Sequence, residues 1–138
     1  MKRVALVTLC GAVALCLVAG PVSALPQFKK DFTDKYIEPA GDEAFKDVAT
    51  KASCNVCHVK GEGKEVRNAY GDELAKLIEG SAKDRLAAAT EAGDGDAEKE
   101  KMAKELAEAF KKVETVKSPD GSTFGDRLKA HKLPVDVE

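Results

Sequence analysis

The chain has 138 residues, a length that fits one domain once a short export segment is set aside. Its 22 basic and 24 acidic residues give a net charge of −2, so the sequence offers no broad basic surface for phosphate backbones. Nucleic acid is therefore not an expected partner.

The beginning of the chain has the features of an export signal. Lys2 and Arg3 precede an uncharged apolar run over residues 4–19, and residues 22–24 (Val-Ser-Ala) match the small-x-small pattern of a signal-peptidase site. The run is shorter than the roughly 20 residues that span a bilayer as a helix. We therefore expect a cleaved signal peptide over residues 1–24 and a periplasmic or secreted protein with no stable membrane insertion. A retained anchor is the alternative.

The next residues lead into the main domain. Residues 25–40 are expected to form an N-terminal arm or short helix, whose aromatic side chains can pack on the domain over residues 41–138. Asp42 is placed to cap a helix that runs up to the cysteines. That helix has one apolar face, formed at helical spacing by Ala44, Phe45, Val48, Ala49 and Ala52.

Further helices are predicted after the cysteines. A polar loop over residues 59–68 precedes a helix over about residues 70–79, and Ser81 with Asp84 begins a short helix that stops near Gly93.

The strongest helical pattern covers residues 96–116, with Leu106, Phe110 and Val113 as its buried stripe, and residues 124–134 can form one more short helix. No stretch alternates with a period of two, so the predicted fold class is all-α. Large apolar side chains are sparse for this many helices, which suggests that a bulky flat cofactor completes the core.

The cysteines outside the signal lie in the run Cys54-Asn55-Val56-Cys57-His58. This C-x-x-C-H spacing is typical of the covalent attachment of haem c. Two thiols three positions apart can each add to one of two vinyl groups on a porphyrin edge, and the next residue can then bring an imidazole to the iron. The sequence therefore predicts Cys54 and Cys57 as cofactor-binding residues and His58 as an iron ligand.

Other roles for the run are less consistent with its surroundings. A structural zinc site needs four ligands, and His131 is the one further histidine or cysteine beyond the signal. A thioredoxin-like dithiol requires a preceding strand, for which the sequence has no pattern. A chance occurrence is the remaining alternative.

The residues around the run resemble the small monohaem cytochromes c of the class I type. In that family a helix leads into C-x-x-C-H, a segment like Pro-Asn-Leu-x-Gly follows, and a last helix crosses the first. Residues 42–53, residues 67–71 (Arg-Asn-Ala-Tyr-Gly) and residues 96–116 match these parts in order, so the resemblance covers about residues 41–116. It implies a small helical domain wrapped around one covalently attached haem.

Two features of the family leave alternatives here. The loop proline whose carbonyl orients the haem histidine is replaced, at Arg67 or Val66. The sixth iron ligand is Met102, His131, a lysine, water or none. Met102 also suits a helix core, and His131 lies in a lysine-rich tail.

Charged residues around the run suggest a surface role. The basic residues there are Lys51, Lys60, Lys64 and Arg67, opposed by Glu62 and Glu65. They form either a docking surface that steers an acidic partner or a solvated rim that serves the haem propionates, with Arg67 and Tyr70 as propionate partners.

The resemblance implies an electron-transfer protein rather than an enzyme, with redox proteins as transiently docking partners. The alternative function is a five-coordinate haem that binds a small gas or reacts with peroxide, which needs an open iron position.

Overall fold

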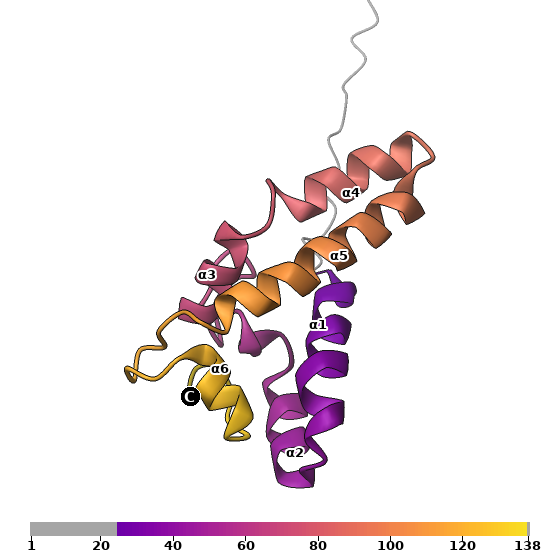
Figure 1. The fold of residues 1–138 in the computed structure, drawn as a ribbon. Coiled ribbons are helices and arrows are strands. Elements are labelled where there is room, and N and C mark those ends of the chain that lie inside the picture. The colour runs from indigo at the N-terminus through magenta and orange to yellow at the C-terminus, as the bar shows by residue number, and fades with distance from the viewer. Residues whose placement is uncertain (1–24, 138) are drawn as a thin grey trace, which may run out of the picture.

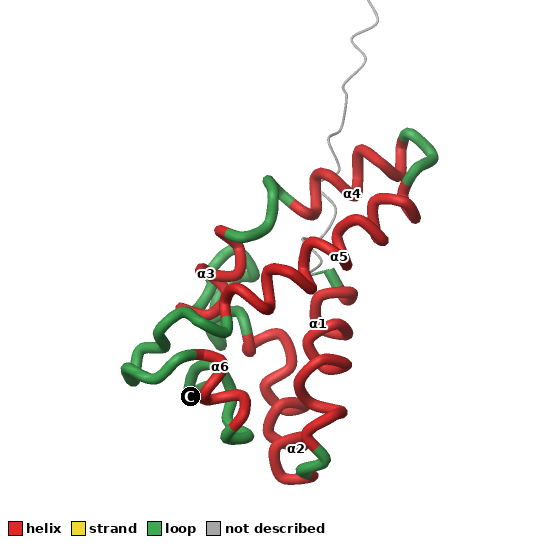
Figure 2. Tube along the Cα trace, viewed as in Figure 1, coloured by secondary structure: helices red, strands yellow, loops and turns green. Residues whose placement is uncertain are grey.

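The computed structural model describes residues 25–137, and the predicted signal peptide lies outside them. Within that range every regular element is a helix (Figures 1 and 2), so the predicted all-α fold class is confirmed. None of these helices has the length and apolarity to cross a membrane. The elements are α1 (Pro26–Phe32), the π-helical turn η1 (Thr33–Ile37), the 3₁₀ turn η2 (Glu38–Ala40), α2 (Glu43–Ala52), the 3₁₀ turn η3 (Ser53–Val56), α3 (Ala69–Lys76), α4 (Ala82–Glu91), α5 (Gly95–Val113) and α6 (Phe124–Lys129).

The predicted arm forms a continuous helical stretch made of α1, η1 and η2. Pro26 stands in the first turn of α1, where its missing amide breaks no hydrogen bond. Gly41 ends the stretch with a left-handed φ of 65°. The Phe32 ring lies 5.1 Å from that of Tyr36 and 6.2 Å from that of Phe110 on α5. The arm is therefore part of the core, as its aromatic residues suggested.

The start of α2 is set by its predicted cap. The Asp42 carboxylate accepts a hydrogen bond from the Phe45 amide at 2.9 Å. Phe45, Ala49 and Ala52 are buried on one face. Val48 was predicted on the same face but is 51% exposed. It lies at the edge of the stripe that the three buried side chains form along the helix.

The longest helix, α5, connects the parts of the fold. Its buried stripe holds the predicted Leu106, Phe110 and Val113 together with Met102 and Ala109. It packs against α1, α3 and α4, and Figure 1 shows α4 and the first half of α5 projecting from the body as a hairpin. α2 is the helix that the resemblance equates with the family's first helix, and it packs on η1. Among the helices before the cysteines, α1 is the one that packs against α5.

All of these helices except α4 contribute to one cluster of buried side chains. Five of its members are aromatic, so protein side chains form a continuous core. The cluster comprises Phe32, Ile37, Phe45, Ala49, Ala52, Val56, Tyr70, Leu74, Leu106, Ala109, Phe110, Val113, Phe124, Leu128, Leu133 and Val135.

A buried arginine on α6 holds together the segments that precede and follow this helix. Arg127 on α6 is 7% exposed, and its guanidinium donates to the Leu133 carbonyl at 2.7 Å and to the Asp136 carboxylate at 2.6 Å. It also donates to Asp120 in the preceding loop. One side chain thus ties together both segments that flank α6.

Candidate functional site

The C-x-x-C-H run forms a tight turn between α2 and the loop that leads to α3. α2 ends at Ala52, and the next residue, Ser53, has a φ of 51° and a ψ of −119°, which are strained for a residue other than glycine. η3 then carries Cys54, and the amides of Cys57 and His58 both donate to the Cys54 carbonyl, at 3.2 and 3.1 Å. The structure therefore brings the three predicted site residues together in one turn.

The Asn68 side chain fixes the backbone of this turn. Its amide group donates to the carbonyls of Asn55 and Val56, both at 3.0 Å, and its oxygen accepts from the Gly71 amide at 3.0 Å to cap α3. The Asn68 backbone amide also donates to the Cys57 carbonyl at 3.1 Å. The family resemblance singled out residues 67–71, but it did not predict that the Asn68 side chain holds the cysteine turn in this way, a role called the clamp below.

Gly71 allows α3 to lie directly on the turn. A Cβ atom built on Gly71 would stand 2.0 Å from the Cys57 carbonyl oxygen and 2.9 Å from its carbonyl carbon. A backbone group cannot move aside as a flexible side chain can. The position therefore requires glycine for space, although its φ is not left-handed.

The cysteines are separate thiols. Neither Cys54 nor Cys57 forms a disulfide, and both are partly exposed as whole residues. Burial of the sulfur raises the pKa of Cys57 to about 12, so its thiol is protonated at neutral pH. Ser53 Oγ lies 4.0 Å from Cys54 Sγ and accepts a hydrogen bond from Lys29 Nζ at 3.1 Å.

His58 presents a neutral imidazole. Burial lowers its pKa, and the Val66 carbonyl beside the ring opposes that shift. Nδ1 is buried, and no hydrogen bond of standard geometry reaches it from residues 25–137. Of Val66 and Arg67, the two residues expected in place of the family's loop proline, Val66 is thus the one whose carbonyl lies by the ring. The neutral form is the one that binds a metal.

Tyr70 is the second group near the turn with an unsatisfied polar atom. It is fully buried, its ring lies 5.2 Å from that of Phe124, and its hydroxyl has no partner in the part of the chain that the structure describes. Burial raises the pKa of Tyr70 well above its usual value, and the nearby Cys57 adds to this. Its role as a propionate partner, like that of the exposed Arg67, stays a prediction.

Met102 is buried on α5. Its side chain is 2% exposed and lies on α5 outside the core cluster that Cys57 contacts. This burial agrees with the expectation of Met102 as a packed helix residue, and its role as an iron ligand stays a prediction.

His131 lies at the far end of α2 from the cysteines. Its Nδ1 is 2.9 Å from the Asp42 carboxylate, and its ring stacks on Phe45 with centroids 5.8 Å apart. Asp42 caps the first turn of α2, so a helix of ten residues, about 15 Å long, separates His131 from Cys54.

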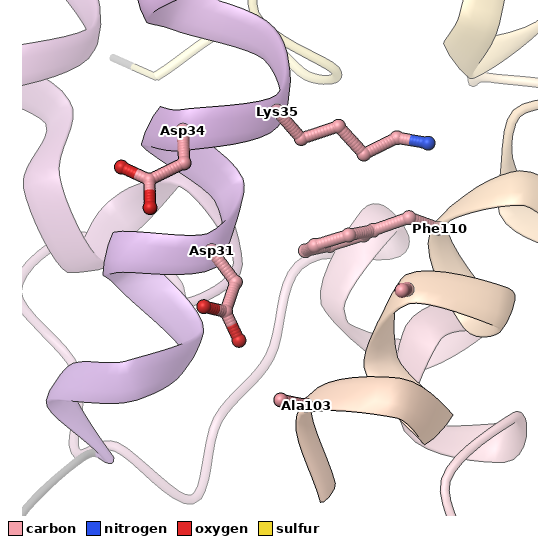
Figure 3. Close-up of a pocket in the computed structure, with 6 residues that line it drawn as sticks. Asp31, Asp34, Lys35, Ala103 and Phe110 are labelled. Atoms are coloured by element: carbon pink, nitrogen blue, oxygen red, sulfur yellow. The ribbon is translucent and has the colours of Figure 1, made fainter. Parts of the chain in front are cut away.

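Two hollows lie away from the cysteine turn. One, of about 290 Å³, is bounded by Asp31, Asp34 and Lys35 on one side and by Ala103, Ala107 and Phe110 of α5 on the other (Figure 3). The second, of about 390 Å³, lies between α4 and α5 and is lined by Glu79, Gly80, Arg85, Glu98 and Lys101. Neither is lined by the C-x-x-C-H residues.

The donor set of the turn can be compared with the needs of a metal ion and of haem c. Nowhere in residues 25–137 do three or more histidine, cysteine, aspartate or glutamate side chains converge on one point, as a tetrahedral ion requires. Two free thiols and a neutral imidazole in one turn are the groups that covalent attachment of haem c uses. No protein-family model, curated protein or solved structure gives a significant match to this chain.

Proposed function

We propose that this protein is an exported electron-transfer protein that carries one haem c, bound covalently through Cys54 and Cys57 with His58 as an axial ligand. The observation that carries the proposal is the C-x-x-C-H run held as one turn, with both thiols free. When bound, haem supplies a one-electron couple at its iron.

The chain's own residues would hold the group in a fixed orientation. Cys54 and Cys57 would hold the group through their sulfurs, and His58 would offer the ring nitrogen other than the buried Nδ1. Asn68 and Gly71 support the turn from the side of α3. A backbone held in this way keeps the ligand set still, as fast electron transfer requires.

The position of the turn also favours electron transfer. Cys54, Cys57 and His58 are each partly exposed, and the residues after them form an exposed loop. A redox partner can therefore approach the site without opening the core, through the small interface that transient complexes use.

The second candidate function is a five-coordinate haem that binds a small gas or reacts with peroxide. The position of His131, about one α2 length from Cys54, favours it over an iron that His131 ligates. An iron with an open position would be high-spin, and this separates the two functions.

Absorption spectra of the exported wild-type protein, oxidised and reduced, test the proposal. We expect a c-type haem spectrum that survives acid–acetone extraction, and loss of stable attachment in Cys57→Ala. His58→Ala should change the spectrum, whereas the matched variant His131→Ala should not. Full retention of extraction-resistant haem by Cys57→Ala would contradict covalent attachment. High-spin spectra in the wild type would favour the gas or peroxide function.

A further inference from the structure

We propose that Ser53 and Lys29 are positioning residues for Cys54, and that they make its thiol the more reactive of the pair toward carbon electrophiles such as a haem vinyl group. The inference rests on the proposed function for the identity of that electrophile, whereas a difference between the two thiols can be measured without haem. Three observations carry it: a strained backbone, a lysine held on a hydroxyl, and a sulfur beside that hydroxyl.

Ser53 occupies a backbone conformation that favours glycine. Its φ of 51° and ψ of −119° turn the chain sharply between Ala52 and Cys54, and this turn is called the corner below. Glycine adopts such angles without steric cost because it has no Cβ atom, whereas a serine must be held there by the surrounding structure. The position thus carries a side chain at a cost that glycine would avoid, so the contacts of the hydroxyl are the feature to explain.

The hydroxyl of Ser53 is held by the N-terminal arm. Lys29, in the last turn of α1, donates from Nζ to Ser53 Oγ at 3.1 Å, across 24 positions of the chain. Lys29 takes part in none of the ion pairs between side chains of residues 25–137. Its ammonium group is therefore available to the hydroxyl, and the contact helps to hold the corner in its strained conformation.

The same hydroxyl lies beside the sulfur of Cys54. Ser53 Oγ is 4.0 Å from Cys54 Sγ, at the outer limit of a hydrogen bond in which the hydroxyl donates to sulfur. A hydroxyl whose oxygen accepts from an ammonium group is a stronger donor, because neighbouring hydrogen bonds polarise one another. Negative charge that develops on the sulfur as the thiol loses its proton is thereby stabilised, and the thiolate is the form that attacks an electrophile.

The two thiols therefore differ in their surroundings. The sulfur of Cys57 is buried and less accessible to an electrophile, whereas that of Cys54 has the Ser53 hydroxyl beside it. When a thiol adds to a vinyl group, the S–H bond and the C=C π bond break, one C–S bond forms, and the proton moves to the other vinyl carbon. No oxidant or reductant is consumed. Cys54 is thus the thiol that is prepared to react before Cys57.

The test measures the alkylation of each cysteine in the reduced, haem-free full chain. Iodoacetamide is the probe, and peptide mass spectrometry gives the rate at Cys54 with Cys57 as the reference in the same molecule. In this reaction the sulfur displaces iodide, forms a C–S bond and releases its proton to the buffer. Ser53→Gly keeps the corner without strain and removes the hydroxyl. Lys29→Gln removes the charge, Lys29→Arg keeps it, and Lys30→Gln, at the neighbouring exposed lysine, is the matched control.

In the wild type we expect Cys54 to react faster than Cys57. Ser53→Gly and Lys29→Gln should slow the reaction of Cys54 roughly two- to tenfold, the effect of losing one hydrogen bond, and leave Cys57 unchanged. Lys29→Arg and Lys30→Gln should react like the wild type. Equal rates at the two cysteines, an unchanged Cys54 rate in Ser53→Gly, or an equal loss in Lys30→Gln would overturn the assignment. An exported wild type without covalent haem would instead overturn the proposed function.

Discussion

The absence of a side chain at Gly71 lets α3 pack on the carbonyl of Cys57. The Asn68 side chain uses that closeness, since it bonds to the motif backbone and to the first turn of α3 at once. At the scale of single residues, the site therefore depends on close packing between the backbone of the cysteine turn and the first turn of α3, a contact called the interlock below.

Gly71→Ala should separate α3 from the turn. The added Cβ would overlap the Cys57 carbonyl, so we expect a loss of about 1–3 kcal/mol in the free energy of unfolding, measured by urea denaturation. Gly63→Ala is the matched control, because its Cβ meets only the flexible Glu65 side chain. Similar losses in the two variants would contradict the interlock.

Two substitutions at Asn68 divide its roles. Asn68→Asp keeps an oxygen for the Gly71 amide but loses the donors to Asn55 and Val56. Asn68→Ala loses both, and removal of the cap alone costs about 0.5–2 kcal/mol. We expect the free energy of unfolding of Asn68→Asp, measured by urea denaturation, to lie between those of the wild type and Asn68→Ala. An aspartate variant as stable as the wild type would show that the clamp on the turn contributes nothing.

At the scale of elements, the arm belongs to the core. α1 packs on α5, and the Phe32 ring lies 6.0 Å from Tyr70 as well as close to Phe110. The residues before the motif thus help to shape the wall behind it.

Phe32→Ala tests the contribution of the arm. Phe32 is 5% exposed, and its truncation should cost about 3–5 kcal/mol of unfolding free energy. Phe28→Ala, at a partly buried position on the same helix, should cost less. Denaturant titration of both variants gives the comparison, and an equal, small effect would mean that the arm is only loosely attached.

The segments around α6 should give the protein an acid-sensitive step. Hydrogen bonds from Ser122, and then from Arg127, lower the pKa of Asp120 from 3.8 to about 2. A lowered folded-state pKa stabilises the fold above pH 3.8 and ceases to do so as pH falls toward 2. Asp120→Asn should therefore be less stable than the wild type at neutral pH. Between pH 3.8 and pH 2 the variant should lose less stability than the wild type does, as followed by circular dichroism. The same dependence of stability on pH in the variant and the wild type over this acid range would contradict the prediction.

At the scale of the whole molecule, local signals and distant contacts were predicted with different success. The caps at Asp42 and Ser81 and the stripe around Leu106 are encoded within a few residues, so the sequence indicated them. The spacing of the cysteines indicated which residues belong to the candidate site, but not the turn that they form. The pairing of His131 with Asp42, 89 positions apart, depends on the folded topology, which no local pattern contains.

The uneven burial along α5 means that one helix belongs to two cooperative units. α4 has no buried residue, and the buried residues of α5 begin at Met102, so the first two turns of α5 are supported mainly by α4. The turns from Leu106 to Val113 are part of the core. Amide hydrogen exchange should therefore be faster in residues 82–101, through local opening of the hairpin, than in residues 106–113, where exchange requires global unfolding.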